Sequence, residues 1–336
     1  MLTVVCLVPV LVVAGYLGWL NHVATTNIQH ADLLPTGTAP ATLPESGAGA
    51  SALPTVGADG DPIDPSEPGG DIAPGAPLVP AESLGDNYLI VGSDARPGLA
   101  GGRSDVIILV HVPVDHHNVT LIHFPRDMYV PIPGRGRNKI NAAYAFGGVP
   151  LLVQTLQNML GVKIDHAVLF GFEGFKRTID AVGGVDVDVE EGGTIDGYTF
   201  TAGRMHLDGP AALAFVRERY DLSRGDLSRG RRQQAVVKAL LLQAVSKETL
   251  ANPVRLAQLV DAATANTTVD SALDVGAMRG ELFALRNLRP GDIRLLTAPI
   301  SGFGSTPGGA SIDLVDWAAI ARLGTTIRED RVDDYR

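Results

Sequence analysis

The composition of the stretch between Ala31 and Pro80 limits which part of this chain can form a folded domain. It contains ten of the 22 prolines, eight glycines and no Phe, Trp or Tyr. Such a segment cannot bury enough apolar surface to offset the entropy lost on ordering. We therefore predict a disordered Pro/Ala/Gly-rich linker over residues 23–83, which would act as a spacer. The folded domain is predicted at residues 84–325, with a polar tail at residues 326–336.

An uncharged apolar run precedes this linker. Residues Leu2 to Leu20 carry no charge and are mostly Leu, Val and Ala. As a helix this run would span about 28 Å, roughly the hydrocarbon thickness of a bilayer. A cleaved signal peptide is the alternative, but no basic segment precedes the run. We predict a transmembrane anchor at residues 1–22.

Short apolar strands alternate with helices from Gly85 onward. Strands are predicted at 87–94, 105–112, 118–124, 167–170, 184–189 and 293–299. Helices are predicted at 140–146, 150–160, 173–182, 208–215, 228–247, 253–262, 271–285 and 313–323. Strands separated by helices favour an α/β layered fold with a mixed sheet.

The charge distribution argues against nucleic acid as a partner. The net charge is −10, but nine acidic residues lie between Asp32 and Asp86, and no Lys or Arg precedes residue 96. Elsewhere 28 acidic residues face 27 basic ones, so the folded part has no basic footprint. The only cysteine, Cys6, excludes disulfides and Cys-rich metal sites.

Two aspartates mark the ends of the first two predicted strands. Asp94 closes the first strand, and Asp105 opens the second, after Gly102-Arg103-Ser104. If these strands are neighbours, the two carboxylates face each other across a short loop. Mg²⁺ takes one or two protein carboxylates and completes its shell with phosphate and water oxygens, so this pair suits it. The alternative is that both aspartates only cap turns.

Basic residues form two further clusters. Arg126 and Asp127 follow the third strand, and Lys139 lies nearby. The other cluster runs from Phe215 to Gln233 and carries six of the 22 arginines.

Spacing within the second cluster suggests a phosphate site. Arg229, Arg232 and Gln233 are spaced i, i+3, i+4 and share one face at a helix N-terminus, where guanidiniums can bind phosphate. Arg217 and Arg219 share a face only if that stretch is extended. The alternative is a solvated basic helix start paired with nearby aspartates.

Two carboxylates and many arginines, without a candidate Ser/His/Asp triad, favour a pyrophosphate site over an acyl-transfer site. Phosphoryl transfer needs an aligned attacking oxygen and neutralisation of the charge that grows on the leaving phosphate. Mg²⁺ and Arg supply that neutralisation.

The motifs together resemble the LytR-CpsA-Psr family over roughly residues 84–247. The matching stretches occur in the same order as in the family: Asn87 to Asp94, Gly102 to Asp105, Phe124 to Asp127, Lys139 to Tyr144, Ile179 to Val187, Phe215 to Arg219 and Arg224 to Gln233. The resemblance implies a three-layer α/β/α domain with a central mixed sheet and a hydrophobic tunnel for a polyprenyl chain. It also implies Mg²⁺-dependent transfer of a glycopolymer from a polyprenyl-pyrophosphate carrier to a peptidoglycan hydroxyl, with Mn²⁺ as a substitute ion.

The resemblance also assigns site residues. It implies that Asp94 and Asp105 bind the metal, and that Asp226 positions the pyrophosphate binders. The expected catalytic set is Asp94, Asp105, Arg126 and Asp226. The expected pyrophosphate binders are Arg103, Arg126, Lys139, Arg217, Arg219, Arg229, Arg232 and Gln233. Gly230 and Arg231 depart from the family, which usually has Gln and Glu there, and Gln234 stands where it often has Arg.

Other functions remain open at this point. A non-catalytic polyprenyl-phosphate or glycan-binding module, an envelope attenuator protein and a pyrophosphatase acting on the carrier link are the alternatives. With the anchor, the resemblance predicts a single-pass protein of the cell membrane whose catalytic domain is extracytoplasmic.

Overall fold

The computed structural model describes residues 29–35, 80–93, 104–218, 222, 225–265, 267–273, 275–306 and 308–336. The anchor predicted at 1–22 lies outside these residues. Among the helices within them, none has both the length and the apolar character needed to span a bilayer.

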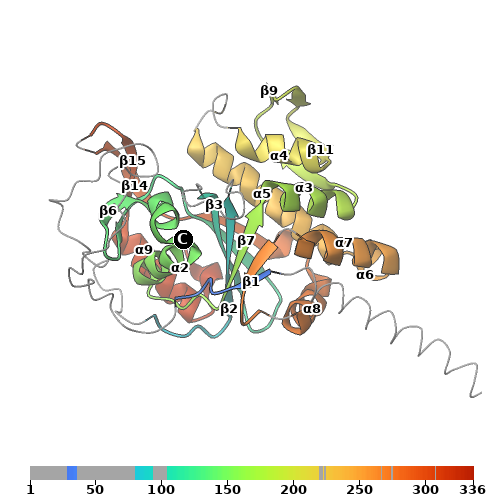
Figure 1. Ribbon diagram of the computed structural model, residues 1–336, viewed down its shortest axis with the longest axis horizontal. Coiled ribbons are helices and arrows are strands. Elements are labelled where there is room, and N and C mark those ends of the chain that lie inside the picture. The colour runs from blue at the N-terminus through green and yellow to red at the C-terminus, as the bar shows by residue number, and fades with distance from the viewer. Residues whose placement is uncertain are drawn as a thin grey trace, which may run out of the picture.

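A seven-stranded mixed sheet forms the centre of the molecule (Figure 1). Its strands, in spatial order, are β1 (Gln29–Ala31), β12 (Thr267–Asp270), β7 (His166–Gly171), β2 (Asp86–Ser93), β3 (Ser104–Val112), β4 (Val119–His123) and β13 (Ile293–Thr297). The pairs β1–β12, β7–β2 and β4–β13 are parallel, and the other three are antiparallel. The predicted α/β fold with a mixed sheet is therefore confirmed.

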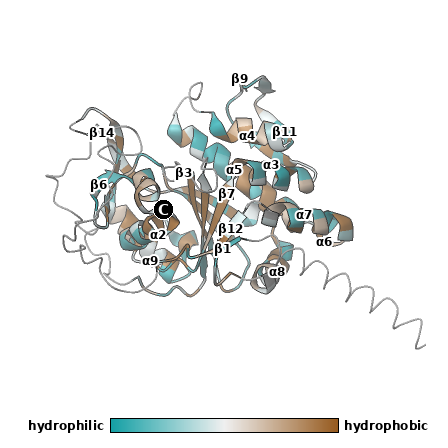
Figure 2. Ribbon diagram, viewed as in Figure 1, coloured by the Kyte–Doolittle hydropathy of each residue, from teal (hydrophilic) through white to brown (hydrophobic). Residues whose placement is uncertain are grey.

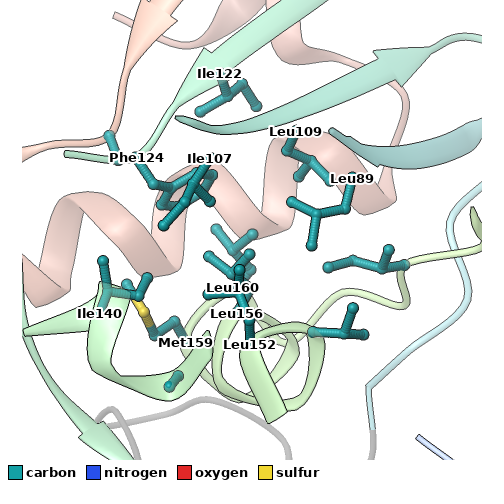
Figure 3. Packing of buried hydrophobic residues seen from close by; sticks show 14 of the residues in the cluster. Leu89, Ile107, Leu109, Ile122, Phe124, Ile140, Leu152, Leu156, Met159 and Leu160 are labelled. Atoms are coloured by element: carbon teal, nitrogen blue, oxygen red, sulfur yellow. The ribbon is translucent and has the colours of Figure 1, made fainter. Parts of the chain in front are cut away.

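Helices cover both faces of this sheet, which makes three layers. On one face, α2 (Ile140–Leu160) and α9 (Trp317–Arg328) pack on buried side chains of β2, β3 and β4. Figure 3 shows this core, where Leu89, Ile107 and Leu109 face Leu152 and Leu156 of α2. On the other face lie α5 (Asp226–Ala244) and α8 (Val275–Ala284). The central strands are accordingly among the most hydrophobic segments in Figure 2.

A second core lies beside the sheet. It joins α3 (Phe172–Ala181), α4 (Gly209–Arg217), α5 and α7 (Pro253–Ala265) to the pair β8 (Val185–Val189) and β11 (Gly203–Leu207). The hairpin β9 (Gly193–Ile195) and β10 (Tyr198–Phe200) extends from it, and α6 (Lys247–Leu250) links α5 to α7. The strand predicted at 184–189 therefore forms, but outside the central sheet.

Two hairpins border the end of β4. They are β5 (Tyr129–Ile132) with β6 (Gly136–Lys139), and β14 (Ile300–Ser305) with β15 (Ser311–Val315). Short 3-10 turns at Leu285–Asn287, Pro290–Asp292 and Val332–Asp334 complete the described elements.

Two segments near the ends of the described chain differ from the prediction. Within the predicted linker, Gln29–Ala31 form an edge strand on β12, and Leu33 is buried in the main core because the sheet offers both a partner edge and an apolar surface. Further along, the helix expected at 313–323 begins only at Trp317, because residues up to Val315 pair with β14 and Asp316 caps the helix.

Candidate functional site

An ion-pair cluster lies where β3 begins and β4 ends. Arg126, in the turn after β4, donates from Nη1 to Asp105 Oδ1 at 2.7 Å. Its Nε lies 3.6 Å from Asp226 Oδ1, and its side chain is only 12% exposed. Three residues predicted from separate motifs thus meet at one point.

Asp226 joins the cluster to α5. It is the first residue of that helix, and Arg229, one turn on, donates to its Oδ1. Gly225 precedes it with φ of +50°, a left-handed conformation that glycine adopts readily. Burial raises the pKa of the Asp226 carboxyl, although Arg229 and Arg126 oppose that shift. The two guanidiniums therefore flank one buried carboxylate.

A second ion pair extends the cluster toward β6. Lys139 Nζ lies 3.4 Å from Asp127 Oδ1, and Arg126 Nε lies 3.9 Å from the same oxygen. Asn141, two residues after Lys139, is fully buried in the first turn of α2.

Several buried polar atoms of this region have no hydrogen-bond partner among the described residues. They are Arg126 Nε, Asp127 Oδ1, Asp226 Oδ2, Gln233 Oε1 and both amide atoms of Asn141. Buried polar groups are nearly always bonded, and leaving one without a partner costs about 1–3 kcal/mol. Their concentration at one place indicates a site arranged to meet a polar ligand. Asn141 was not among the predicted site residues, although it belongs to the Lys139 to Tyr144 motif.

Glutamines hold the start of α5 against the sheet. Gln233 Nε2 donates to the backbone carbonyl of Asp105 at 3.2 Å, and Gln234 Nε2 donates to that of Leu121 at 2.8 Å. Gly230 makes this close approach sterically feasible, since a Cβ there would lie 2.3 Å from the ring of His123. Two of the family departures, Gly230 and Gln234, thus share one packing role.

Two predicted phosphate binders have other contacts. Arg232 donates to the backbone carbonyl of Glu191 at 2.6 Å and lies over the Phe215 ring, 4.5 Å from its centroid. Burial lowers its pKa. Arg217 is exposed and lies 5.1 Å from the Phe172 ring centroid.

An extended chain from Phe215 onward, the condition for Arg217 and Arg219 to share a face, is not met as far as Arg217. The Asp208 side chain accepts from Ala211 N and starts α4, which continues to Arg217; only Glu218 is extended.

Three predicted residues lie outside the described residues: Asp94, Arg103 and Arg219. The condition that their two strands are neighbours is met, because β2 and β3 are antiparallel and Ser93 pairs with Ser104.

Asp313 is a site residue that the motifs did not indicate. It lies in β15, is 7% exposed, and its backbone N donates to the carbonyl of Asp127 at 2.8 Å. Burial raises the pKa of its carboxyl to about 6, with Asp127 and Asp226 adding to the shift and Lys139 opposing it. The alternation of apolar Ile312 and Leu314 with polar residues could have indicated a strand that contains Asp313.

Fold and site together define a mixed α/β protein with a buried Asp/Arg/Lys cluster at the strand ends, suited to anionic phosphate. The chain matches the LytR_cpsA_psr family over residues 81–317 and belongs to that family.

Relatives and solved structures agree with this assignment. The chain is 35% identical over 247 residues to a polyisoprenyl-teichoic acid–peptidoglycan teichoic acid transferase TagU of Oceanobacillus iheyensis, covering 72% of this chain and 74% of that one. It is 35% identical over 264 residues to a probable cell wall biosynthesis protein LcpB of Corynebacterium glutamicum, covering 74% and 62%.

Among solved structures, Bacillus subtilis TagV superposes with a TM-score of 0.65 at 28% identity, covering 75% of this chain and 98% of TagV. A structure described as TagT bound to LI-WTA has a TM-score of 0.60 at 25% identity, covering 74% and 91%.

Proposed function

We propose that this protein transfers a phospho-linked glycopolymer from a polyprenyl-pyrophosphate carrier to a hydroxyl group of peptidoglycan in cell-wall assembly. The observation that carries the proposal is the largely buried ion-pair cluster of Asp105, Arg126, Asp226 and Arg229, which contains buried polar atoms without a hydrogen-bond partner among the described residues. The names of the relatives, as teichoic acid transferases, favour the same reaction class.

In this proposal the basic side chains stabilise the transition state because they are already held in place. The carboxylates of Asp105 and Asp226 hold Arg126 and Arg229 in place, so little reorganisation is needed when negative charge grows on the leaving phosphate. Lys139, held by Asp127, adds a third positive charge. The planar guanidiniums can each form paired hydrogen bonds to phosphate oxygens.

We also propose Mg²⁺, or Mn²⁺ in its place, held by Asp105 together with Asp94. The Asp105 side chain is 35% exposed and offers hard oxygen donors. No group of three His, Cys, Asp or Glu side chains within the described ranges is placed to hold a metal, so phosphate and water oxygens would complete the shell. When bound, such an ion would neutralise charge on the phosphate oxygens.

The carrier's hydrocarbon chain would lie along the sheet face under α5. Tyr88, Ile90 and Val106 belong to inner strands but are only partly buried, and they pack beside Val237 and Leu241 of α5. Inner strands usually have both faces covered when helices flank a sheet. The remaining apolar surface suits a polyprenyl chain that continues from the pyrophosphate.

The anchor, the linker and the extracytoplasmic location stay proposals that rest on the composition of residues 1–83. In the absence of an acceptor we expect slow hydrolysis of the carrier link, with water in place of the hydroxyl.

The test is transfer by the full chain from a synthetic polyprenyl-pyrophosphate saccharide to peptidoglycan fragments. Arg126→Ala should reduce kcat/KM at least 100-fold, since it removes a charged contact to phosphate. Arg231→Ala is the matched control, because Arg231 is half-exposed and pairs with Glu190 outside the cluster. A wild-type chain that binds the carrier but transfers nothing with Mg²⁺ or Mn²⁺ present would contradict the proposal and favour a binding module.

A further inference from the structure

Asp313 enters the ion-pair cluster from a part of the chain that carries none of the motifs. Strand β15 lies beside the turn after β4, where Met128 and Asp313 form a parallel bridge. This pairing fixes the backbone of Asp313 against that of Asp127 and buries its side chain.

The charges that face Asp313 come from three elements. Asp127 lies in the turn after β4, Lys139 on β6 and Asp226 at the start of α5. Asp127 is paired with Lys139, and Asp226 is paired with Arg229 and lies near Arg126. By contrast, no Lys or Arg of the described part of the chain lies within 4.0 Å of the Asp313 carboxylate, and none donates a hydrogen bond to it.

This difference separates the three carboxylates chemically. Protonation of Asp226 would weaken its charge-assisted bond to Arg229, and protonation of Asp127 would do the same to its pair with Lys139. Asp313 has no such bond to lose. Burial and the two neighbouring carboxylates also raise its pKa to about 6, close to neutral pH and within the range where a general base is most effective.

We propose that Asp313 is the general base that accepts the proton of the acceptor hydroxyl. The assignment rests on the proposed transfer and deepens it. The hydroxyl oxygen forms a bond to the phosphorus that carries the glycopolymer, while the bond from that phosphorus to the bridging oxygen of the pyrophosphate breaks. The O–H proton passes to a carboxylate oxygen of Asp313, and polyprenyl phosphate leaves with the electron pair of the broken bond.

The same hairpin offers a surface for the acceptor sugar. Phe303 of β14 is the register partner of Asp313, so both side chains lie on one face of the hairpin. Phe303 is 67% exposed. An exposed aromatic ring beside the base would give the apolar face of a sugar ring a place to pack.

The experiment compares wild type, Asp313→Asn, Asp313→Glu and Phe303→Ala as full chains in the transfer assay, with carrier binding measured separately. Asp313→Asn should lower kcat about 100-fold or more with carrier affinity within about twofold. The wild-type rate should fall as pH drops below about 6, and Asp313→Asn should lose that acidic limb. Asp313→Glu should restore part of the rate and of the limb. Phe303→Ala should raise KM for the acceptor, and Asp196→Asn, on the exposed turn after β9, serves as the control.

The outcomes separate the two proposals. An active wild type with an equally active Asp313→Asn variant would overturn the assignment of Asp313 alone. Loss of carrier binding together with transfer in Asp313→Asn would also overturn it, because the residue would then be structural. A wild type that transfers nothing would overturn the proposed function and this assignment with it.

Discussion

The packing of α5 on β4 can be tested through Gly230 and His123. A Cβ at Gly230 would lie 2.3 Å from His123 Cε1 and 2.4 Å from Nδ1, far closer than van der Waals contact. His123 is 2% exposed, and burial, with a further contribution from Arg229, lowers its pKa to about 3, so the ring is neutral at pH 7. Gly230→Ala therefore tests how the added methyl group fits against an uncharged ring.

The expected free energies follow from two opposing effects. Overpacking a filled core costs about 1–3 kcal/mol. Replacing Gly by Ala inside a helix returns about 1 kcal/mol. Gly230→Ala should thus lower the free energy of unfolding by up to about 2 kcal/mol. In a His123→Ala background the ring is absent, and the same substitution should stabilise by about 1 kcal/mol.

The assay is urea unfolding of wild type, both single variants and the double variant, analysed as a double-mutant cycle. The coupling energy should be about 1–3 kcal/mol. Because Arg229 precedes Gly230, Gly230→Ala should also reduce transfer activity, and the double variant should recover part of it. An equal effect of Gly230→Ala in both backgrounds would refute the steric reasoning.

Two more predictions concern stability. The raised pKa of Asp313 means that folding favours its neutral carboxyl. The contribution of this carboxyl to the free energy of unfolding is therefore fully present below pH 3.8 and is lost as pH rises through about 6. At pH 7.5 the free energy of unfolding of Asp313→Asn should therefore exceed that of wild type by about 1–3 kcal/mol, after allowance for solvent screening. At pH 4 the two proteins should differ little. Equal stability at pH 7.5 would contradict this. Deletion of residues 1–35 should lower the free energy of unfolding by about 2–4 kcal/mol relative to deletion of residues 1–28, because it removes β1 and buried Leu33; equal melting temperatures would show that β1 contributes nothing.

Local patterns predicted most of the helices and six strands, whereas nine of the fifteen described strands, among them β5, β6, β12 and β14, were not predicted. Continuous apolar runs predicted β2, β3 and β4, because inner strands covered by helices need apolar residues on both faces. The helix at 150–160 and the break before it were also predicted, and Gly147 and Gly148 do leave helical geometry inside α2. β15 was missed since five residues of strand give little periodicity beside the helix that follows.

The sequence by itself determined which residues of the motif region are candidates for the proposed chemistry. Asp105, Arg126, Asp226 and Arg229 could be chosen because charged residues interrupt apolar elements at their ends, and that is a local property of the chain. Only the tertiary structure decided which groups these residues contact. In the fold, Arg126 lies between the carboxylates of Asp105 and Asp226. Arg232 contacts the Phe215 ring and the Glu191 carbonyl. Asp313 lies beside Asp127, although 186 positions separate them along the chain. Such pairings depend on how strands from distant segments align, and on the burial that follows, which no local pattern encodes.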